Sequence, residues 1–274
     1  MKKILTIFLT TTIVQSLDAQ RSIDGLIKAE RDFAAYSVAN STKEAFLKFL
    51  DSTGIVFDNG KAINGIETWN KKEKRPGVLN WWPLFAEISD SNDFGYTTGQ
   101  WIFQQSATDT VAARGQYTTV WHINKNDEWK FLVDLGVNNT PVNSSREAKI
   151  INVTKQEIKK GFIPHVLPYI LAENNFIKAF EKNKAKAYKK YLSGECILNR
   201  NGNAPAADEM SRQELINSTS PGTRFTLTGW GIASGEDIAY VYGTAILNGK
   251  TENYLRVWRH EKDGWKIALE VLRY

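Results

Sequence analysis

The chain has 274 residues, of which 42% are hydrophobic and 24% are charged, a composition typical of folded globular proteins. A chain of this length predicts about two domains. The formal net charge of +5 is small, and the basic residues are spread along the chain instead of forming a basic patch. We therefore expect no nucleic-acid partner.

The first 19 residues have the layout of a secretory signal peptide. Lys2 and Lys3 precede an apolar run over residues 4–14, and Leu17-Asp18-Ala19 supplies a cleavage site. The apolar run is shorter than the ~20 residues that a membrane-spanning helix needs. No cysteine lies near the cleavage point to carry a lipid. The sequence therefore predicts a periplasmic or secreted protein without a membrane anchor.

The next stretch predicts helix, helix, short strand and small helix, in that order. Ser41 with Glu44 forms a capping box before the second helix, and Asn59-Gly60 is a turn pair that stops the strand. Helical spacing of apolar residues, caps and turn residues give the ranges 22–38, 41–51, 55–57 and 64–69.

Three strands follow, and they predict a curled sheet with one face on a core. Aromatic and β-branched residues alternate with polar ones in the second and third strands, which is typical of half-buried antiparallel strands. Residues 124–127 supply the turn between these two. The predicted strands span residues 96–103, 115–123 and 129–135.

The same order of elements occurs again in the second half of the chain. Helices are predicted near residues 170–180 and 187–192, a short strand at 197–198, and a small helix capped by Ser211 and Glu214. Strands follow over 224–232 and 237–274. The aligned pairs include Tyr96 with Tyr240, Tyr117 with Tyr254, Trp121 with Trp258, and Asp134 with Glu270.

We interpret this as a tandem duplication. The predicted domains span residues 22–137 and 167–274, and a linker with a lead-in segment occupies 138–166. Exposed aromatic strand faces need cover, so we expect the two sheets to pack on each other as an internal pseudo-dimer.

The segment WPLFAEISDSNDFGYTTG, residues 82–99, resembles the nuclear-transport-factor-2-like cone, also called SnoaL-like. It is most similar to a secreted, mostly uncharacterised bacterial branch, and the strand at 129–134 fits the same pattern. The second copy departs from it, because Trp81-Trp82-Pro83 has no counterpart there. The resemblance implies an α+β fold of two tandem cone-shaped domains, each with N-terminal helices packed on a curved antiparallel sheet around a hollow. Relatives use that hollow for isomerase, dehydratase, cyclase or hydrolase chemistry, or only for binding, so the fold leaves function open.

Asp134 is the candidate catalytic residue. A carboxylate facing an apolar cone would have a raised pKa and could act as a general base, as the resemblance to ketosteroid-isomerase-like proteins implies. Strict alternation, however, places Asp134 on the face opposite Trp129, Phe131 and Val133. If those three pack on the helices, Asp134 lies on the outer face or in a sheet-to-sheet contact.

The aromatic side chains of the two sheets are the candidate ligand contacts. A tyrosine hydroxyl can donate a hydrogen bond to a ligand carbonyl or oxyanion, or the ring can simply fill a curved sheet. With Glu270 included, the candidate ligand-binding residues are Trp81, Trp82, Tyr96, Trp101, Tyr117, Trp121, Tyr240 and Tyr254.

No metal or cofactor is predicted. His122, His165 and His260 lack metal-ligand spacing, and the sequence has no phosphate-binding glycine loop or Ser-His-Asp order. The single cysteine, Cys196, lies in a predicted strand, where a small buried side chain is the expected role.

The function that we expect is binding of a small apolar or amphipathic ligand in the cone pocket of the first domain. Two alternatives stay open. One is an isomerase-, dehydratase- or hydrolase-type enzyme with Asp134 as general base and a tyrosine as hydrogen-bond donor. The other is a protein-interaction module that uses an open sheet face.

Overall fold

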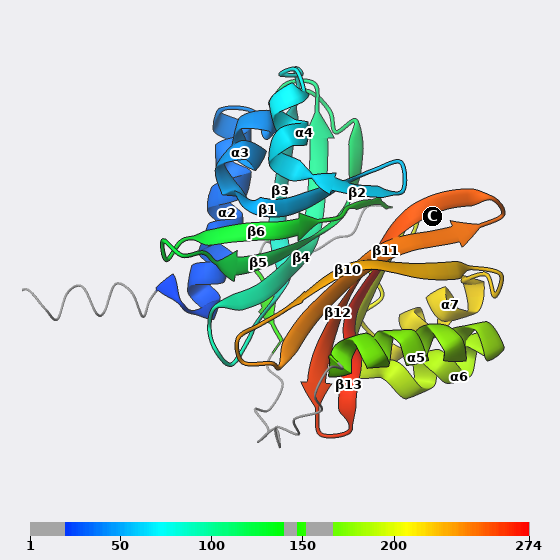
Figure 1. The fold of residues 1–274 in the computed structure, drawn as a ribbon. Helices are drawn as coiled ribbons and strands as arrows, with labels where there is room; N and C mark the ends of the chain where they lie inside the picture. The colour runs from blue at the N-terminus through cyan, green and yellow to red at the C-terminus, as the bar shows by residue number, and fades with distance from the viewer. Residues whose placement is uncertain (1–19, 140–146, 152–166, 274) are drawn as a thin grey trace, which may run out of the picture.

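The computed structural model describes residues 20–139, 147–151 and 167–273 (Figure 1). The predicted signal peptide and most of the predicted linker lie outside the described residues. Within the described ranges, no helix is long and apolar enough to cross a membrane.

The first half places three helices against one sheet. Ser22, Ser41 and Asn64 are the N-caps, and each side chain accepts a hydrogen bond from a backbone N–H of the first turn. The strand order is β2-β1-β6-β5-β4-β3-β8, and β7 pairs with β5. The elements are α2 (Ile23–Ala39), α3 (Thr42–Phe49), β1 (Leu50–Asp58), β2 (Lys61–Asn64), α4 (Gly65–Lys71), β3 (Val78–Ile88), β4 (Phe94–Gln104), β5 (Ala113–Ile123), β6 (Trp129–Asp134), β7 (Val137–Asn138) and β8 (Lys149–Ile150).

The second half has the same order of helices and long strands, with a sheet in the order β10-β11-β12-β13-β9. Its small helix begins earlier than predicted, because Asp208 and not Ser211 is the N-cap and accepts the bond from the Ser211 N–H. The elements are α5 (Pro168–Lys182), α6 (Lys184–Tyr191), β9 (Leu192–Arg200), α7 (Glu209–Ser218), β10 (Arg224–Ile232), β11 (Ile238–Leu247), β12 (Lys250–Glu261) and β13 (Gly264–Leu272).

Each sheet is mixed and not wholly antiparallel. The four long strands of each half pair antiparallel; in the first half β3 is a fourth long strand beside the three predicted ones. The strand after the second helix, β1 or β9, instead pairs parallel with the last long strand, β6 or β13. Both are nine-residue strands, longer than the two or three residues expected from sequence.

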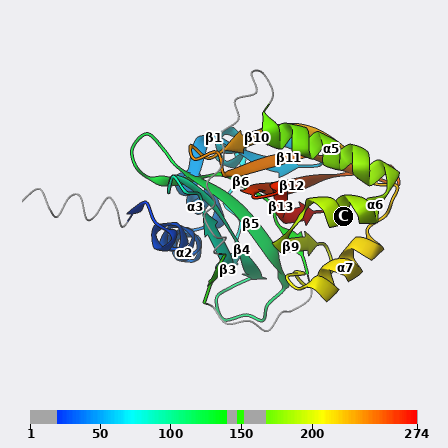
Figure 2. The ribbon, with the colours of Figure 1, turned by 90° about the horizontal axis from the view of Figure 1, so that it is seen from below.

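The two sheets lie between two helical layers. Helices α2–α4 lie on the outer side of the first sheet and α5–α7 on the outer side of the second (Figures 1 and 2). Between the sheets is one apolar cluster with residues from both halves, including Phe94, Tyr96, Val133, Tyr240 and Leu269. Arg259 of β12 crosses this contact and holds both carboxylate oxygens of Glu87 on β3 at 2.5 and 2.7 Å.

A bulge in β6 decides which way Asp134 faces. Trp121 of β5 lies opposite Phe131 and Val120 lies opposite Val133, so Leu132 is an extra residue on β6. Phe131 therefore packs on the helices of the first half, whereas Val133 packs between the sheets. The strict alternation expected from sequence was wrong here, and Asp134 faces the inside of the cone. Ala268 is the extra residue at the corresponding place in β13.

Candidate active site

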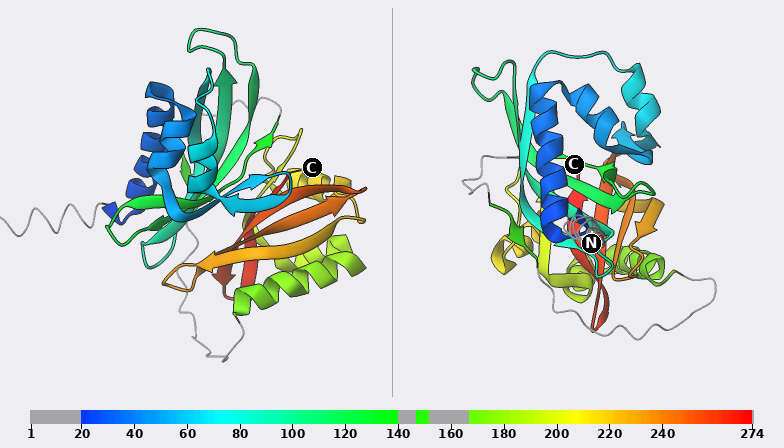
Figure 3. Two further views of the ribbon diagram at one scale, coloured as in Figure 1. Left: turned by 45° about the horizontal axis from the view of Figure 1, so that its top comes forward. Right: turned by 90° about the vertical axis from the view of Figure 1, so that its left-hand side faces the viewer.

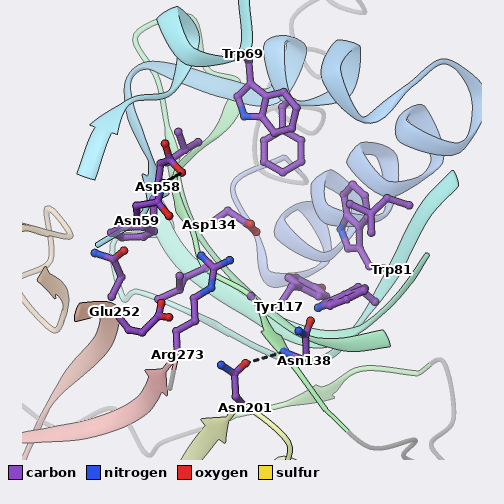
Figure 4. A pocket seen from close by; sticks show the side chains of 18 of the residues that line it. Asp58, Asn59, Trp69, Trp81, Tyr117, Asp134, Asn138, Asn201, Glu252 and Arg273 are labelled. Atoms are coloured by element: carbon purple, nitrogen blue, oxygen red, sulfur yellow. Dashed lines mark hydrogen bonds between the residues drawn. The ribbon is translucent and has the colours of Figure 1, made fainter. Parts of the chain in front are cut away.

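The inside of the first cone is a cavity of about 830 Å³. This volume lies in the range of small-molecule sites, which are commonly 300–1,000 Å³. Its inner part is aromatic, with side chains from α2, α3, α4 and three strands (Figure 4). These are Phe33, Phe46, Trp69, Trp81, Trp101 and Tyr117.

Asp134 points into this cavity and keeps contact with solvent through it. Thr119, opposite Asp134 on β5, donates a hydrogen bond to Oδ2 at 2.9 Å. Burial raises the pKa of Asp134 to about 6, while the Thr119 hydroxyl and the charge of Arg273 partly offset that rise. A carboxyl group with this pKa can accept or return a proton near neutral pH.

Glu30 of α2 lies behind Asp134 and is fully buried. Its carboxylate accepts hydrogen bonds from the indole N–H groups of Trp81, at 2.5 Å, and Trp121, at 2.8 Å, and from the Thr97 hydroxyl. None of these donors carries a charge. Burial raises the pKa of Glu30 to about 7; the three hydrogen bonds oppose the rise and the nearby Asp134 adds to it.

Tyr117 and its aligned partner Tyr254 differ in what their hydroxyl groups do. Tyr254 donates to Glu173 of α5 at 2.9 Å. The Tyr117 hydroxyl is buried and has no hydrogen-bond partner of ordinary geometry in the described part of the chain, although Thr97 lies near enough to influence its pKa. Burial and the charge of Glu30 hold the pKa of Tyr117 well above its usual value, so the phenol is protonated and can donate to a ligand.

The second half of the chain supplies the mouth of the first cavity. Arg273, just after β13, lines it together with the start of β12, facing the β1–β2 hairpin of the first half (Figures 3 and 4). The hairpin turn at Gly60 has φ of +80°, and a Cβ there would stand 2.8 Å from the Thr251 side chain. A glycine is therefore required where the hairpin approaches β12.

The second cone is filled by an arginine. Arg256 of β12 is fully buried, and it donates to Glu173 and Glu270 at 2.5 Å each. Its guanidinium lies 4.2 to 4.5 Å from the ring centroids of Phe225, Tyr254 and Phe176.

Glu270 is consequently an ion-pair partner and not a second free acid. Arg200 and Tyr188 also donate to it. Burial alone would raise the pKa of Glu270, but Arg256 and Arg200 outweigh burial and lower it. Asp134 and Glu270 thus occupy corresponding positions with opposite shifts in pKa.

The structure brings together four of the residues predicted from sequence: Trp81, Trp101, Tyr117 and Asp134 all line the cavity. The other predicted residues do not line it. Trp121 binds Glu30 behind it, Tyr96 donates to Glu87 between the sheets, and Tyr240 stacks on Phe94 there. Trp82, next to Trp81 on β3, is not among the lining residues, while Tyr254 and Glu270 belong to the filled second cone.

Two residues of the site were missed by sequence reasoning. Glu30 follows Leu26 by four residues and precedes Phe33 by three, which places a charged side chain on the buried face of α2. That spacing was the available signal. No sequence pattern indicated Arg273, because it reaches the first cavity only through the packing of the two halves.

Neither histidine chemistry nor a metal is indicated by the described residues. His122 Nε2 lies 2.9 Å from Asp51 Oδ2 on the first sheet, outside the large cavity. No group of three or more His, Cys, Asp or Glu side chains in the described ranges could hold a metal ion. Cys196 is free and fully buried in the core of the second half.

No family model matches the chain, and no curated protein matches it. Similar solved structures include a cystatin-like protein of unknown function from Nostoc punctiforme, with 14% identity and a TM-score of 0.32 over 39% of this chain and 88% of that one. An NTF-2-like protein of unknown function from Shewanella oneidensis has 16% identity and a TM-score of 0.31, covering 38% and 94%. A putative ketosteroid isomerase from Parabacteroides distasonis has 17% identity and a TM-score of 0.33, covering 44% and 90%.

Proposed function

We propose that the protein binds a small amphipathic organic molecule inside the first cone. The observation that carries this proposal is the contrast between the cones. The first is a cavity of about 830 Å³ with an aromatic inner part, whereas the buried Arg256 fills the second. An apolar cavity with a few convergent polar groups is the general character of a small-molecule site.

The polar side chains of the cavity determine which functional groups the ligand must carry. Asp134 accepts hydrogen bonds, and the protonated Tyr117 hydroxyl is a donor that makes no hydrogen bond of ordinary geometry with the described residues, although Thr97 lies nearby. A ligand that carries a carbonyl or hydroxyl group at this depth satisfies Tyr117, and its apolar body lies against the indole rings of Trp81 and Trp101.

Binding can be measured through these tryptophans. Titration of the purified protein with an apolar fluorescent probe should quench tryptophan emission in a saturable manner at one site. Native mass spectrometry of protein purified without detergent provides a second readout. Absence of saturable binding for probes of roughly 150–400 Da, the size of molecule that a cavity of this class accommodates, would contradict the proposal.

A second candidate is proton transfer within the same cavity, as in an isomerase. Its specific support is the pKa of Asp134, about 6, in a group that still reaches solvent. Asp134 would remove a proton next to a ligand carbonyl, and Tyr117 would donate to the developing oxyanion. Asp134→Asn should then keep ligand binding and lose turnover of β,γ-unsaturated ketones. If the wild-type protein turns over none of the ketones that it binds, the proton-transfer proposal fails and the binding proposal stands.

We also propose that the protein acts outside the cytoplasm, and the support for this is the signal-peptide layout of residues 1–19. N-terminal sequencing of the protein from a periplasmic extract should begin near Gln20. An intact Met1 in that sequence would contradict export by cleavage.

A further inference from the structure

The mouth of the first cavity holds a cation that forms no ion pair with the described side chains around it. Arg273 is half-buried and lines the cavity. Its backbone N–H is bonded to Asn253, but its guanidinium makes no hydrogen bond or ion pair with the described residues that surround it. The charge of Arg273 lowers the pKa of Asp134 without the two side chains forming an ion pair.

The other two cations that line the cavity are engaged. Lys250 is paired with Glu252 at 2.8 Å. Lys72 lies over the Trp69 ring, 4.1 Å from its centroid. Arg273 therefore remains as the lining cation available to a ligand, and Figure 4 shows its side chain extending into the cavity below Asp134.

We propose that Arg273 binds the carboxylate of a monoanionic, otherwise apolar ligand. The proposal rests on the proposed ligand binding in the first cone and adds the chemical class of the ligand. A planar guanidinium offers two parallel N–H donors that match the two oxygens of a carboxylate. The apolar body of such an acid extends from the mouth toward the aromatic inner part.

A single negative charge fits the cavity better than a double one. Asp58 and Asp134 also line the cavity, so a second charge on the ligand meets carboxylates instead of a free cation. We therefore assign a carboxylate and not a phosphate monoester. Because Arg273 belongs to the second half and Asp134 to the first, both halves build this one site.

The test compares three ligands with the same ten-carbon chain: decanoate, decanol and decyl phosphate. Binding to the purified protein at pH 7.5 is followed by tryptophan fluorescence and calorimetry, below the concentrations at which the ligands form micelles. The variants are Arg273→Gln and Arg273→Lys, with Lys262→Gln, an exposed lysine in the β12–β13 turn outside the cavity, as the charge-removal control. Circular dichroism checks that each variant is folded.

The expected result is that the wild-type protein prefers decanoate over decanol by roughly 10- to 100-fold, the range for a charge-assisted hydrogen-bonded pair. Arg273→Gln should remove that preference, Arg273→Lys should keep part of it, and Lys262→Gln should keep all of it. Equal affinity for acid and alcohol in the wild-type protein, or an acid preference that survives in Arg273→Gln, overturns the assignment and leaves cavity binding standing. If the protein binds decyl phosphate more tightly than decanoate, the assignment of a carboxylate ligand is overturned. If none of the three ligands binds although the apolar fluorescent probe does, the carboxylate assignment fails; if the probe does not bind either, the proposed function itself fails.

Discussion

Thr119 and Arg256 stand at the same position in the two sheets, Thr119 opposite Asp134 and Arg256 opposite Glu270. Thr119 donates one neutral hydrogen bond to its carboxylate, whereas Arg256 neutralises two carboxylates and fills the space around them. The side chain at this one position therefore distinguishes the two cones. The first is hollow, and its carboxyl groups have pKa values near neutral pH; the second is filled, and its carboxylates are in ion pairs.

Thr119→Arg should close the first cone. The introduced guanidinium would reach Asp134 and Glu30, as Arg256 reaches Glu270 and Glu173, and would occupy the ligand's space. We expect probe affinity to fall by at least about ten-fold while the fold is kept, because a filled pocket excludes its ligand sterically. Thr119→Val has nearly the same volume and should bind as the wild-type protein does. A folded Thr119→Arg variant with unchanged affinity would show that the ligand lies elsewhere.

Arg256→Met should destabilise the second half strongly. The variant leaves Glu173 buried with no cation in contact and Glu270 with Arg200 alone. Removing one partner of a buried ion pair typically costs about 3–5 kcal/mol of unfolding free energy, measurable by urea denaturation. The triple variant Arg256→Met, Glu173→Gln and Glu270→Gln should recover most of that loss. If the single variant lost less than about 1 kcal/mol, the network would not support the fold as described.

Several of these positions could be predicted from sequence, and others could not. The cap at Ser41 was visible because a capping box is formed by residues three positions apart in the sequence. The inward face of Asp134 was not visible, since the bulge at Leu132 changes the phase of β6 and arises from pairing with β5. A local pattern cannot report a shift in register between two strands.

The filled second cone was hidden for a similar reason. The alignment of Asp134 with Glu270 indicated equivalent positions correctly. Whether each carboxylate is paired depends on Arg256 and Arg200, which lie on other strands. The alignment therefore predicted where each carboxylate lies, but it did not predict whether that carboxylate is ion-paired.

Glu30 should make stability depend on pH. Its pKa is about 7 when folded and ordinarily 4.5, so between these values the folded state binds more protons than the unfolded state. Stability therefore falls as pH rises from about 4.5 to 7, by roughly 3 kcal/mol in total from this group. In Glu30→Gln the unfolding free energy should fall less steeply over this interval, because the contribution of Glu30 is removed and those of the other carboxyl groups stay. An identical slope in urea denaturation at pH 5, 6 and 7 would contradict the burial of a neutral Glu30.

We propose that the two halves form an internal pseudo-dimer in solution, supported by the apolar cluster between the sheets and by the pair of Arg259 with Glu87. Small-angle scattering should give one compact particle, and two separated lobes would refute the idea. Arg259→Met should lower the unfolding free energy by about 3–5 kcal/mol because Glu87 stays buried. Adding Glu87→Gln should reduce that loss, and an unchanged loss would mean that Arg259 acts through packing alone.

The most direct test of the account is a crystal structure of the protein soaked with a saturating probe such as decanoate. We predict ligand density in the first cone, between the rings of Trp81 and Trp101 and reaching Arg273, with none beside Arg256 in the second cone. Density in the second cone or between the sheets, with an empty first cone, would contradict the claim that the first cone is the functional site.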